Sequence, residues 1–330
     1  MRLLRRRQVL AGAALGLSFG WGPAARAQGA RVYRIGILET VPAELNRNNL
    51  DGLLRGLRER GYVEGQNLRI EYRSANGRAE RFLDLATEFV HLPVDLIVTR
   101  GTPAARAAKA ATDQIPIVMA AIAEPLGVGV VASLARPGGN VTGFSAYVTE
   151  LAGKRVELLK EARPSIARIG FLQNMSNPAS PPQWEATQAC ASALGLSAEF
   201  FDVRSASDIA DAFARIRKNP VDALSVGIDA LTQANAKMIV DLAAEHKLMT
   251  GYPAGEFVDV GGLLSYGPSY PDLYYRAAGL IDKIFKGAKP GDLPVEQPTK
   301  LEFVLNRKTA SALGLTVPHS LLLRVTRVID

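Results

Sequence analysis

The three histidines are the first candidates for catalysis or metal binding, because imidazole does both near neutral pH. His91 and His246 fall at the ends of amphipathic helical patterns, and His319 lies in a C-terminal turn. No two of them have the spacing of metal ligands. The sequence also has no G-x-S-x-G motif, phosphate-binding loop or cysteine–histidine pair. It therefore predicts no catalytic residue, no metal site and no cofactor.

A segment near residue 100 is better suited to binding an anion. Residues 99–105 read TRGTPAA and follow an apolar strand pattern. Thr102 suits a helix N-cap, and Pro103 suits the first helical position. Gly101 allows the backbone to approach a ligand closely. The unbonded amides of such a helix start would hold a carboxylate or phosphate, although a plain helix cap has the same sequence, so both interpretations stay open.

Polar and aromatic side chains recur at the ends of the expected strands. Ligands of parallel α/β sheets bind at the carboxyl ends of the strands, so this recurrence predicts a polar cleft with aromatic walls. Any one of these residues could equally belong to a solvated loop. The candidate ligand-binding residues are Glu39, Thr40, Gly101, Thr102, Ala123, Glu124, Asn174, Asp229, Tyr252, Glu256 and Tyr266.

The elements that must position these residues are indicated by an internal repeat. The run RIGILE at 34–39 returns as RIGFLQ at 168–173. Each copy is a short apolar strand pattern followed by a helical pattern, which is typical of a parallel α/β sheet. Strands alternate with helices of 10–18 residues after both copies. We therefore expect an α/β fold with two similar lobes and a ligand cleft between them.

Composition and charge fit a two-domain globular protein. The chain has 330 residues, of which 48% are hydrophobic and 22% are charged. Its net charge of +7 is largely local, since five arginines lie in the first 27 residues, where there is no acid. The remainder has 34 basic and 32 acidic side chains. This balance gives no reason to expect nucleic acid as a partner.

The first 27 residues resemble an export signal. Arg5–Arg7 form a positive region, residues 9–22 are weakly apolar, and Ala25–Ala27 form an A-x-A cleavage site. Arg6 and Arg7 begin a twin-arginine-like pattern. The segment is too short and too broken for a membrane anchor. Cys190 is the only cysteine, so we expect no internal disulfide and no lipid anchor, and hence a soluble periplasmic protein.

Three further segments resemble a known family. They are LGVGVVASLARPGGNVTG at 126–143, GLLSYGP at 262–268, and LPVEQPTK at 293–300 followed by Asn306 and ALGLTVP at 312–318. This set resembles ABC-transporter substrate-binding proteins of the tryptophan/tyrosine-binding type. Two departures are Glu124-Pro125, where relatives often carry Asp-Pro, and the missing lipoprotein cysteine.

The resemblance implies a type I periplasmic binding fold, with two Rossmann-like lobes joined by three crossings that close on a small solute. It also implies delivery to a membrane permease driven by an ATPase. We expect residues 31–146 with 258–293 to form the first lobe, and 147–257 with 294–330 the second. The protein should be a monomer.

The leading hypothesis is a periplasmic receptor for a carboxylate-bearing solute, either an amino acid or an aromatic acid. The helix start at Gly101 and Thr102 would hold its acidic group, with residues 121–123 beside it, while Asp229 or Glu256 would meet an ammonium group. One alternative is a periplasmic α/β enzyme using the same cleft, but no nucleophile–base pair supports it. Another is a sugar-repressor-like regulator, which the export signal and the missing helix-turn-helix argue against.

Overall fold

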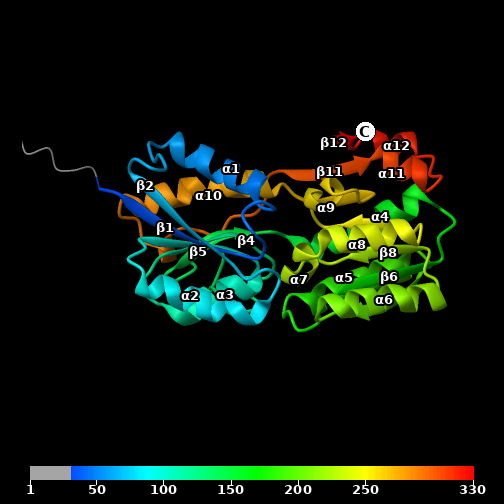
Figure 1. Cartoon of the computed structure of the whole chain (residues 1–330), viewed down its shortest axis with the longest axis horizontal. Helices are drawn as coiled ribbons and strands as arrows, with labels where there is room; N and C mark the ends of the chain where they lie inside the picture. Colours follow the sequence, from blue (N-terminus) through cyan, green and yellow to red (C-terminus); the bar gives the residue numbers. More distant parts are fainter. Residues whose placement is uncertain (1–30) are drawn as a thin grey trace, which may run out of the picture. The chain divides into compact units, whose positions relative to one another are not determined.

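The computed structural model describes residues 31–330, which form two β-sheets flanked by helices (Figure 1). The export signal expected at 1–27 lies outside the described residues. No helix of residues 31–330 is long and apolar enough to cross a bilayer. The fold is α/β with mostly parallel strands, so the fold class predicted from the internal repeat is confirmed.

The first sheet has five parallel strands in the order β2-β1-β3-β4-β5. Their bounds are Tyr33–Glu39 (β1), Leu68–Ser74 (β2), Leu96–Arg100 (β3), Ile117–Ile122 (β4) and Val141–Ser145 (β5). The strands β3, β4 and β5 consist of buried residues throughout, as expected of a sheet covered on both faces, whereas the edge strand β2 carries three charged side chains.

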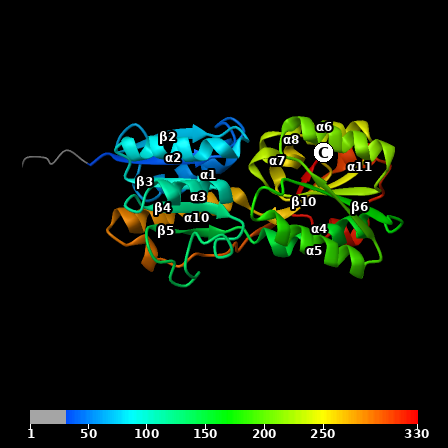
Figure 2. The same ribbon diagram turned by 90° about the horizontal axis from the view of Figure 1, so that it is seen from below.

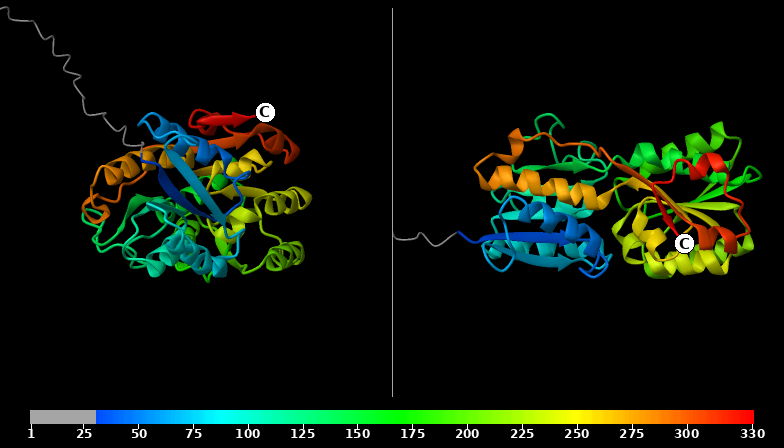
Figure 3. Two further views of the ribbon diagram at one scale, coloured as in Figure 1. Left: turned by 60° about the vertical axis from the view of Figure 1, so that its left-hand side comes forward. Right: turned by 90° about the horizontal axis from the view of Figure 1, so that it is seen from above.

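Two helix pairs cover the two faces of the first sheet (Figures 1 and 2). Helices α2 (Phe82–His91) and α3 (Thr102–Ala111) cover one face, and a 3-10 turn (Ala79–Arg81) precedes α2. Helices α1 (Arg47–Arg58) and α10 (Tyr270–Phe285) cover the other and lie along each other (Figure 3).

The α1–α10 contact is unusually close because α1 presents glycines to α10. A Cβ atom added at Gly52 would lie 2.5 Å from the carbonyl oxygen of Pro271, and one at Gly56 would lie 2.6 Å from that of Tyr275. This contact fixes the start of α10, where Tyr270 is located.

The second sheet has seven strands in the order β12-β11-β10-β9-β8-β6-β7. All neighbours are parallel except β10 and β11, which are antiparallel. The bounds are Arg168–Gln173 (β6), Ser197–Asp202 (β7), Ala223–Val226 (β8), Met249–Tyr252 (β9), Leu264–Pro268 (β10), Leu301–Asn306 (β11) and Arg327–Ile329 (β12).

Helices also flank the second sheet, with α4 packed on α5 and α6 on α8. The bounds are Val148–Ala162 (α4), Ser180–Ala193 (α5), Ala206–Lys218 (α6), Ala230–Ala234 (α7), Ala236–Glu245 (α8), Gly255–Asp259 (α9), Arg307–Ala312 (α11) and His319–Leu322 (α12), with a 3-10 turn at Pro290–Asp292.

The chain passes from one sheet to the other three times. The first crossing lies between β5 and α4, and the second lies between β10 and α10. The third lies between Glu296, which forms a bridge with β5, and the start of β11. The strand β10 pairs with β9 and β11, so it belongs to the second sheet, although the segment 258–293 was expected in the first lobe. The other lobe bounds stay a prediction.

The internal repeat has a packing reason. A Cβ atom at Gly36 would lie 3.0 Å from the Phe89 ring, and one at Gly170 would lie 2.8 Å from the Phe201 ring. In each sheet, the repeated glycine therefore leaves room for an aromatic side chain, from the helix α2 in the first sheet and from the neighbouring strand β7 in the second.

Candidate functional site

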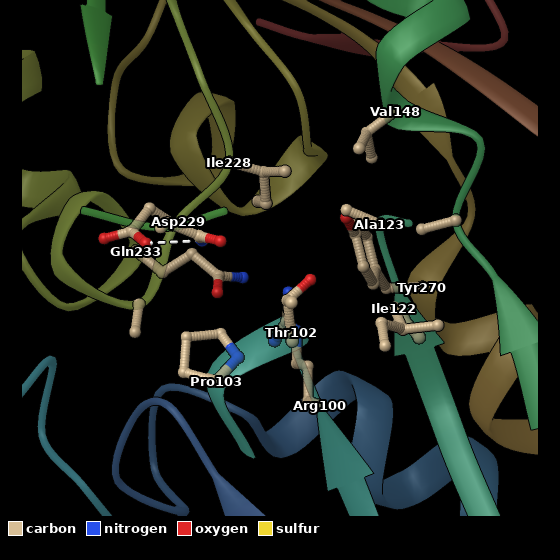
Figure 4. A pocket seen from close by; sticks show the side chains of 15 residues that line it. Arg100, Thr102, Pro103, Ile122, Ala123, Val148, Ile228, Asp229, Gln233 and Tyr270 are labelled. Carbon is tan, nitrogen blue, oxygen red and sulfur yellow. Dashed lines mark hydrogen bonds between the residues drawn. The ribbon is translucent and has the colours of Figure 1, made fainter. Parts of the chain in front are cut away.

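A pocket lies at the carboxyl ends of strands from both sheets (Figure 4). The space free of protein atoms amounts to about 380 Å³, which includes open solvent because the pocket is only partly enclosed. The first sheet contributes the end of β3, the start of α3 and the end of β4. The second contributes the loop after β8 and the helix α7, while α4 and α10 contribute Val148 and Tyr270. This is the position at which parallel α/β sheets bind ligands.

Four of the candidate residues line this pocket, and they come from both sheets. Gly101, Thr102 and Ala123 lie on the side of the first sheet, and Asp229 lies on the side of the second. Ala121 and Ile122 complete the 121–123 wall that was expected beside Thr102. Contact of these residues with a ligand stays a prediction.

The start of α3 differs from the expected cap. Gly101 is the N-cap residue, with φ of 85°, and Thr102 is the first helical residue. The prediction that Thr102 caps the helix was therefore wrong, because the positive φ needs a glycine in the cap position. The Thr102 side chain is 2% exposed, and its hydroxyl has no hydrogen-bond partner within residues 31–330. This hydroxyl and the first helical amides are thus available to an acceptor in the pocket.

Asp229 provides the acidic side of the pocket. One carboxylate oxygen accepts from the Leu231 amide at 2.8 Å and caps α7, while the other accepts from Asn177 Nδ2 at 2.7 Å. Burial raises the pKa of Asp229, and the hydrogen bond from Asn177 opposes this rise. A cationic group of a ligand would stabilise the charged carboxylate of Asp229 further.

Arg100 also lines the pocket, but its charge is already neutralised. Nη2 contacts both carboxylate oxygens of Glu256 at 2.9 Å. Burial lowers the pKa of Arg100, but the Glu256 and Glu39 carboxylates together outweigh burial and hold this pKa above its ordinary value. The guanidinium lies over the Tyr270 ring, with Cζ 4.5 Å from the ring centroid. With the Gln233 amide oxygen turned toward Arg100, this oxygen accepts from Nη2 at 2.5 Å and from Nε at 3.2 Å.

Glu39 and Thr40 do not line the pocket. Glu39 interacts electrostatically with Arg100, and Thr40 contacts Gln233. Glu39 is fully buried and accepts from the Thr40 amide at 2.9 Å and from the Tyr274 hydroxyl. Burial raises its pKa to about 7, against the attraction of Arg100. The Thr40 hydroxyl lies 3.2 Å from the Gln233 side chain, so it links the two sheets.

The other candidate residues lie outside the pocket lining. Glu124 accepts from the Thr149 hydroxyl, and Asn174 lies beside Asp229, where its amide lowers the pKa of that carboxyl group. Tyr252 stacks on Phe257, and Tyr266 packs against Phe303. Glu256 reaches the pocket only through Arg100. The ligand contacts predicted for these residues have no support from the pocket lining.

Sequence analysis missed four polar or aromatic residues of the pocket: Arg100, Asn177, Gln233 and Tyr270. Arg100 lies within the segment 99–105 that was singled out, but it was not given a role in binding. Tyr270 could not be found from strand ends, because it belongs to a helix that packs back onto the first sheet.

Taken together, the pocket can bind a molecule of mixed charge. Helix amides and the Thr102 hydroxyl favour an anion on one side. Asp229 favours a cation on the other, and Figure 4 shows it across the pocket from Tyr270. The side chains of Ile122, Val148 and Ile228 supply apolar walls between these groups.

Comparisons with known proteins are consistent with a ligand-binding pocket. A family model described as ABC transporter substrate binding protein matches residues 34–329. A tyrosine-binding protein of Clostridioides difficile (strain R20291) is 30% identical over 281 residues, covering 85% of this chain and 81% of the relative. A crystal structure of an ABC domain with L-Trp from Streptococcus pneumonia is 34% identical, with a TM-score of 0.81, and covers 89% of this chain and 100% of that chain.

A conserved domain protein from Vibrio cholerae is 28% identical, with a TM-score of 0.84, and covers 90% of this chain and 100% of that chain. A leucine-binding protein from Thermotoga maritima, at 14% identity and a TM-score of 0.56 over 77% of this chain and 83% of that chain, shares the fold.

Proposed function

Since this chain belongs to the family of ABC transporter substrate-binding proteins, we propose that it is the periplasmic receptor of an importer and captures a small carboxylate-bearing solute. The solute is an amino acid or an aromatic acid. The chain has the type I periplasmic binding fold of this family, and the pocket between its sheets is the proposed binding site.

The observation that carries this proposal is the pairing of an anion site with a cation site in one pocket. The unpartnered Thr102 hydroxyl and the amides at the start of α3 suit a carboxylate. The buried carboxylate of Asp229 suits an ammonium group. An α-amino acid carries an ammonium and a carboxylate group on the same carbon, so it can meet both sites at once.

The apolar walls suit a hydrocarbon side chain. Ile122, Val148 and Ile228 would cover a ring or a branched chain, and burying it would favour binding by about 25 cal/mol per Å² of apolar surface. The tyrosine-binding relative and the L-Trp complex support an aromatic amino acid.

The location and partners are also part of the proposal. The receptor is exported and cleaved after Ala27, stays soluble without a lipid anchor, and acts as a monomer. It hands its solute to a permease in the inner membrane and catalyses no reaction. The family membership supports the transport partners, and Ala25–Ala27 supports export.

Calorimetry on residues 28–330 tests the binding function. We expect L-tryptophan, L-tyrosine or L-phenylalanine to bind, and tryptamine and tyramine, which lack the carboxylate, to bind at least tenfold more weakly. Changing Asp229 to Asn keeps a good helix cap and should weaken binding of the amino acid more than that of indole-3-propionate, which lacks the amine. The proposal fails if no amino acid or aromatic acid binds, or if the amines bind equally well.

A further inference from the structure

Arg155 on α4 is a buried cation with no counter-ion among residues 31–330. Its side chain is 0% exposed. Nη1 donates to the Tyr266 carbonyl at 3.4 Å, while Nε and Nη2 have no hydrogen-bond partner among the described residues. None of the ion pairs within residues 31–330 includes it. A buried charge is costly unless it is paired, so this arrangement needs an explanation.

The contrast with Arg100 is informative. Both arginines are buried, but Arg100 is neutralised by Glu256. Burial lowers the pKa of Arg155 to about 10, so its guanidinium is still charged at neutral pH. Arg155 therefore contributes a positive potential that no carboxylate within residues 31–330 cancels.

That potential reaches the ligand pocket. Arg155 lies seven residues, or two helical turns, after Val148 on the same side of α4, and Val148 lines the pocket. Tyr270, also in the pocket, lies within electrostatic reach of both Arg100 and Arg155. Burial raises the pKa of Tyr270 to about 12, so the phenol stays neutral and can donate to an acceptor. Figure 4 shows Val148 and Tyr270 on the side of the pocket away from Asp229.

We propose that Arg155 is a selectivity residue that favours an anionic group of the ligand on the Tyr270 side of the pocket without touching it. The inference rests on the proposed function and deepens it, because it assigns a cause to the preference for a carboxylate. A unit charge about 10 Å away in a partly buried site changes the affinity for an anion by about tenfold. The bound carboxylate would partly offset the charge of Arg155 at this distance without forming an ion pair with it.

The test combines a change in charge on the protein with a change in charge on the ligand. Arg155→Met removes the charge and keeps an unbranched side chain, while Arg155→Lys keeps the charge. L-tryptophan is compared with L-tryptophanamide, which has no carboxylate. We expect Arg155→Met to weaken the binding of L-tryptophan about tenfold and that of the amide less than twofold. Arg155→Lys should retain most of the affinity for L-tryptophan. Lys154→Met removes an exposed cation from the same helix and should leave the affinity for both ligands unchanged.

The ligand-free melting temperature gives an independent result. Because Arg155 is unpaired without ligand, Arg155→Met should melt no lower than the wild type, and we expect it to melt higher. A lower melting temperature, or an equal loss of affinity for acid and amide, would make Arg155 a structural residue and overturn the inference. If the wild type binds none of the acids, the proposed function fails, and the melting temperature still decides the role of Arg155.

Discussion

Thr102 makes a testable distinction at the scale of single residues. Its hydroxyl is buried, unpartnered and in the pocket, whereas Thr99 on β3 also has a buried, unpartnered hydroxyl but does not line the pocket. We expect Thr102→Val to weaken binding of the solute by about 1–3 kcal/mol, since it removes one hydrogen bond to the ligand carboxylate. Calorimetry with the wild-type ligand measures this loss.

Thr99→Val is the matched control, because it makes the same chemical change three residues earlier, on the strand β3. It should leave affinity unchanged. Equal affinities of the Thr102→Val variant and the wild type would show that the ligand does not use this hydroxyl.

Glu39 should make stability depend on pH. Burial raises its pKa to about 7 in the folded protein, above the value of about 4.5 that it has when exposed. The folded state therefore binds a proton more tightly than the unfolded state, and its contribution to stability is lost as the pH rises from 4.5 to 7. We expect Glu39→Gln to remove this loss and to raise the free energy of unfolding at pH 8 by about 1–3 kcal/mol.

Urea denaturation of both proteins at pH 5 and pH 8 measures this effect. The variant and the wild type should differ more at pH 8 than at pH 5. The assignment to Glu39 would be contradicted if the free energy of unfolding of the wild type rose from pH 5 to pH 8 and that of the variant changed with pH in the same way.

At the scale of elements, the contact between α1 and α10 determines where Tyr270 stands. We expect Gly52→Ala to destabilise the protein by about 1–3 kcal/mol, because its Cβ atom would lie 2.5 Å from a backbone oxygen of Pro271 and the helices must separate. Since Pro271 follows Tyr270, ligand affinity should fall as well. Thermal denaturation and calorimetry measure the two effects.

Gly279→Ala on α10 is the control. Its Cβ atom would lie 3.4 Å from the end of the Arg60 side chain, which can move. A helical Gly-to-Ala change of this kind should be neutral or stabilising. Gly52→Ala with wild-type stability would show that the two helices can separate at little cost.

The elements also show what sequence patterns can predict. Strands such as 34–39 and 168–173 can be recognised in the sequence as apolar runs, because both faces of each sheet are buried. Residues 231–248 carry a single helical pattern in the sequence, but they form two helices, because Asn235 leaves the helical conformation between α7 and α8. The short elements α9, α12 and β12 were missed, since three to five residues carry too little periodicity.

The pocket was predictable only in part, for a related reason. Gly101, Thr102, Ala123 and Asp229 follow strands directly, so their position in the fold can be inferred from the strand pattern. Tyr270 is brought to the pocket by a helix that packs on a sheet distant in sequence, and Arg155 lies on a helix that reaches the pocket only with Val148. Tertiary packing of this kind leaves no local signal in a single sequence.

At the scale of the whole molecule, the two sheets are joined at the back of the pocket by Arg100 and its neighbours. Arg100 comes from the first sheet, and Glu256 and Gln233 come from helices beside the second. The Thr40–Gln233 contact joins the same two sides. These contacts can exist only while the lobes are close, so they should favour the closed state of a hinge motion about the three crossings.

We therefore expect Glu256→Gln to shift the protein toward an open state. Removing the carboxylate leaves Arg100 unneutralised when the lobes are closed, whereas opening returns the guanidinium to water. In the proposed function the ligand binds across both lobes, so we expect its apparent affinity to fall by about tenfold or more as the closed population falls. X-ray scattering should show a larger radius of gyration without ligand and compaction at saturating ligand.

Asp259→Asn is the control, because it breaks an ion pair with Arg327 beside the second sheet alone, and it should scatter like the wild type. Identical scattering and affinity in Glu256→Gln and Asp259→Asn would mean that the Arg100–Glu256 pair does not govern closure.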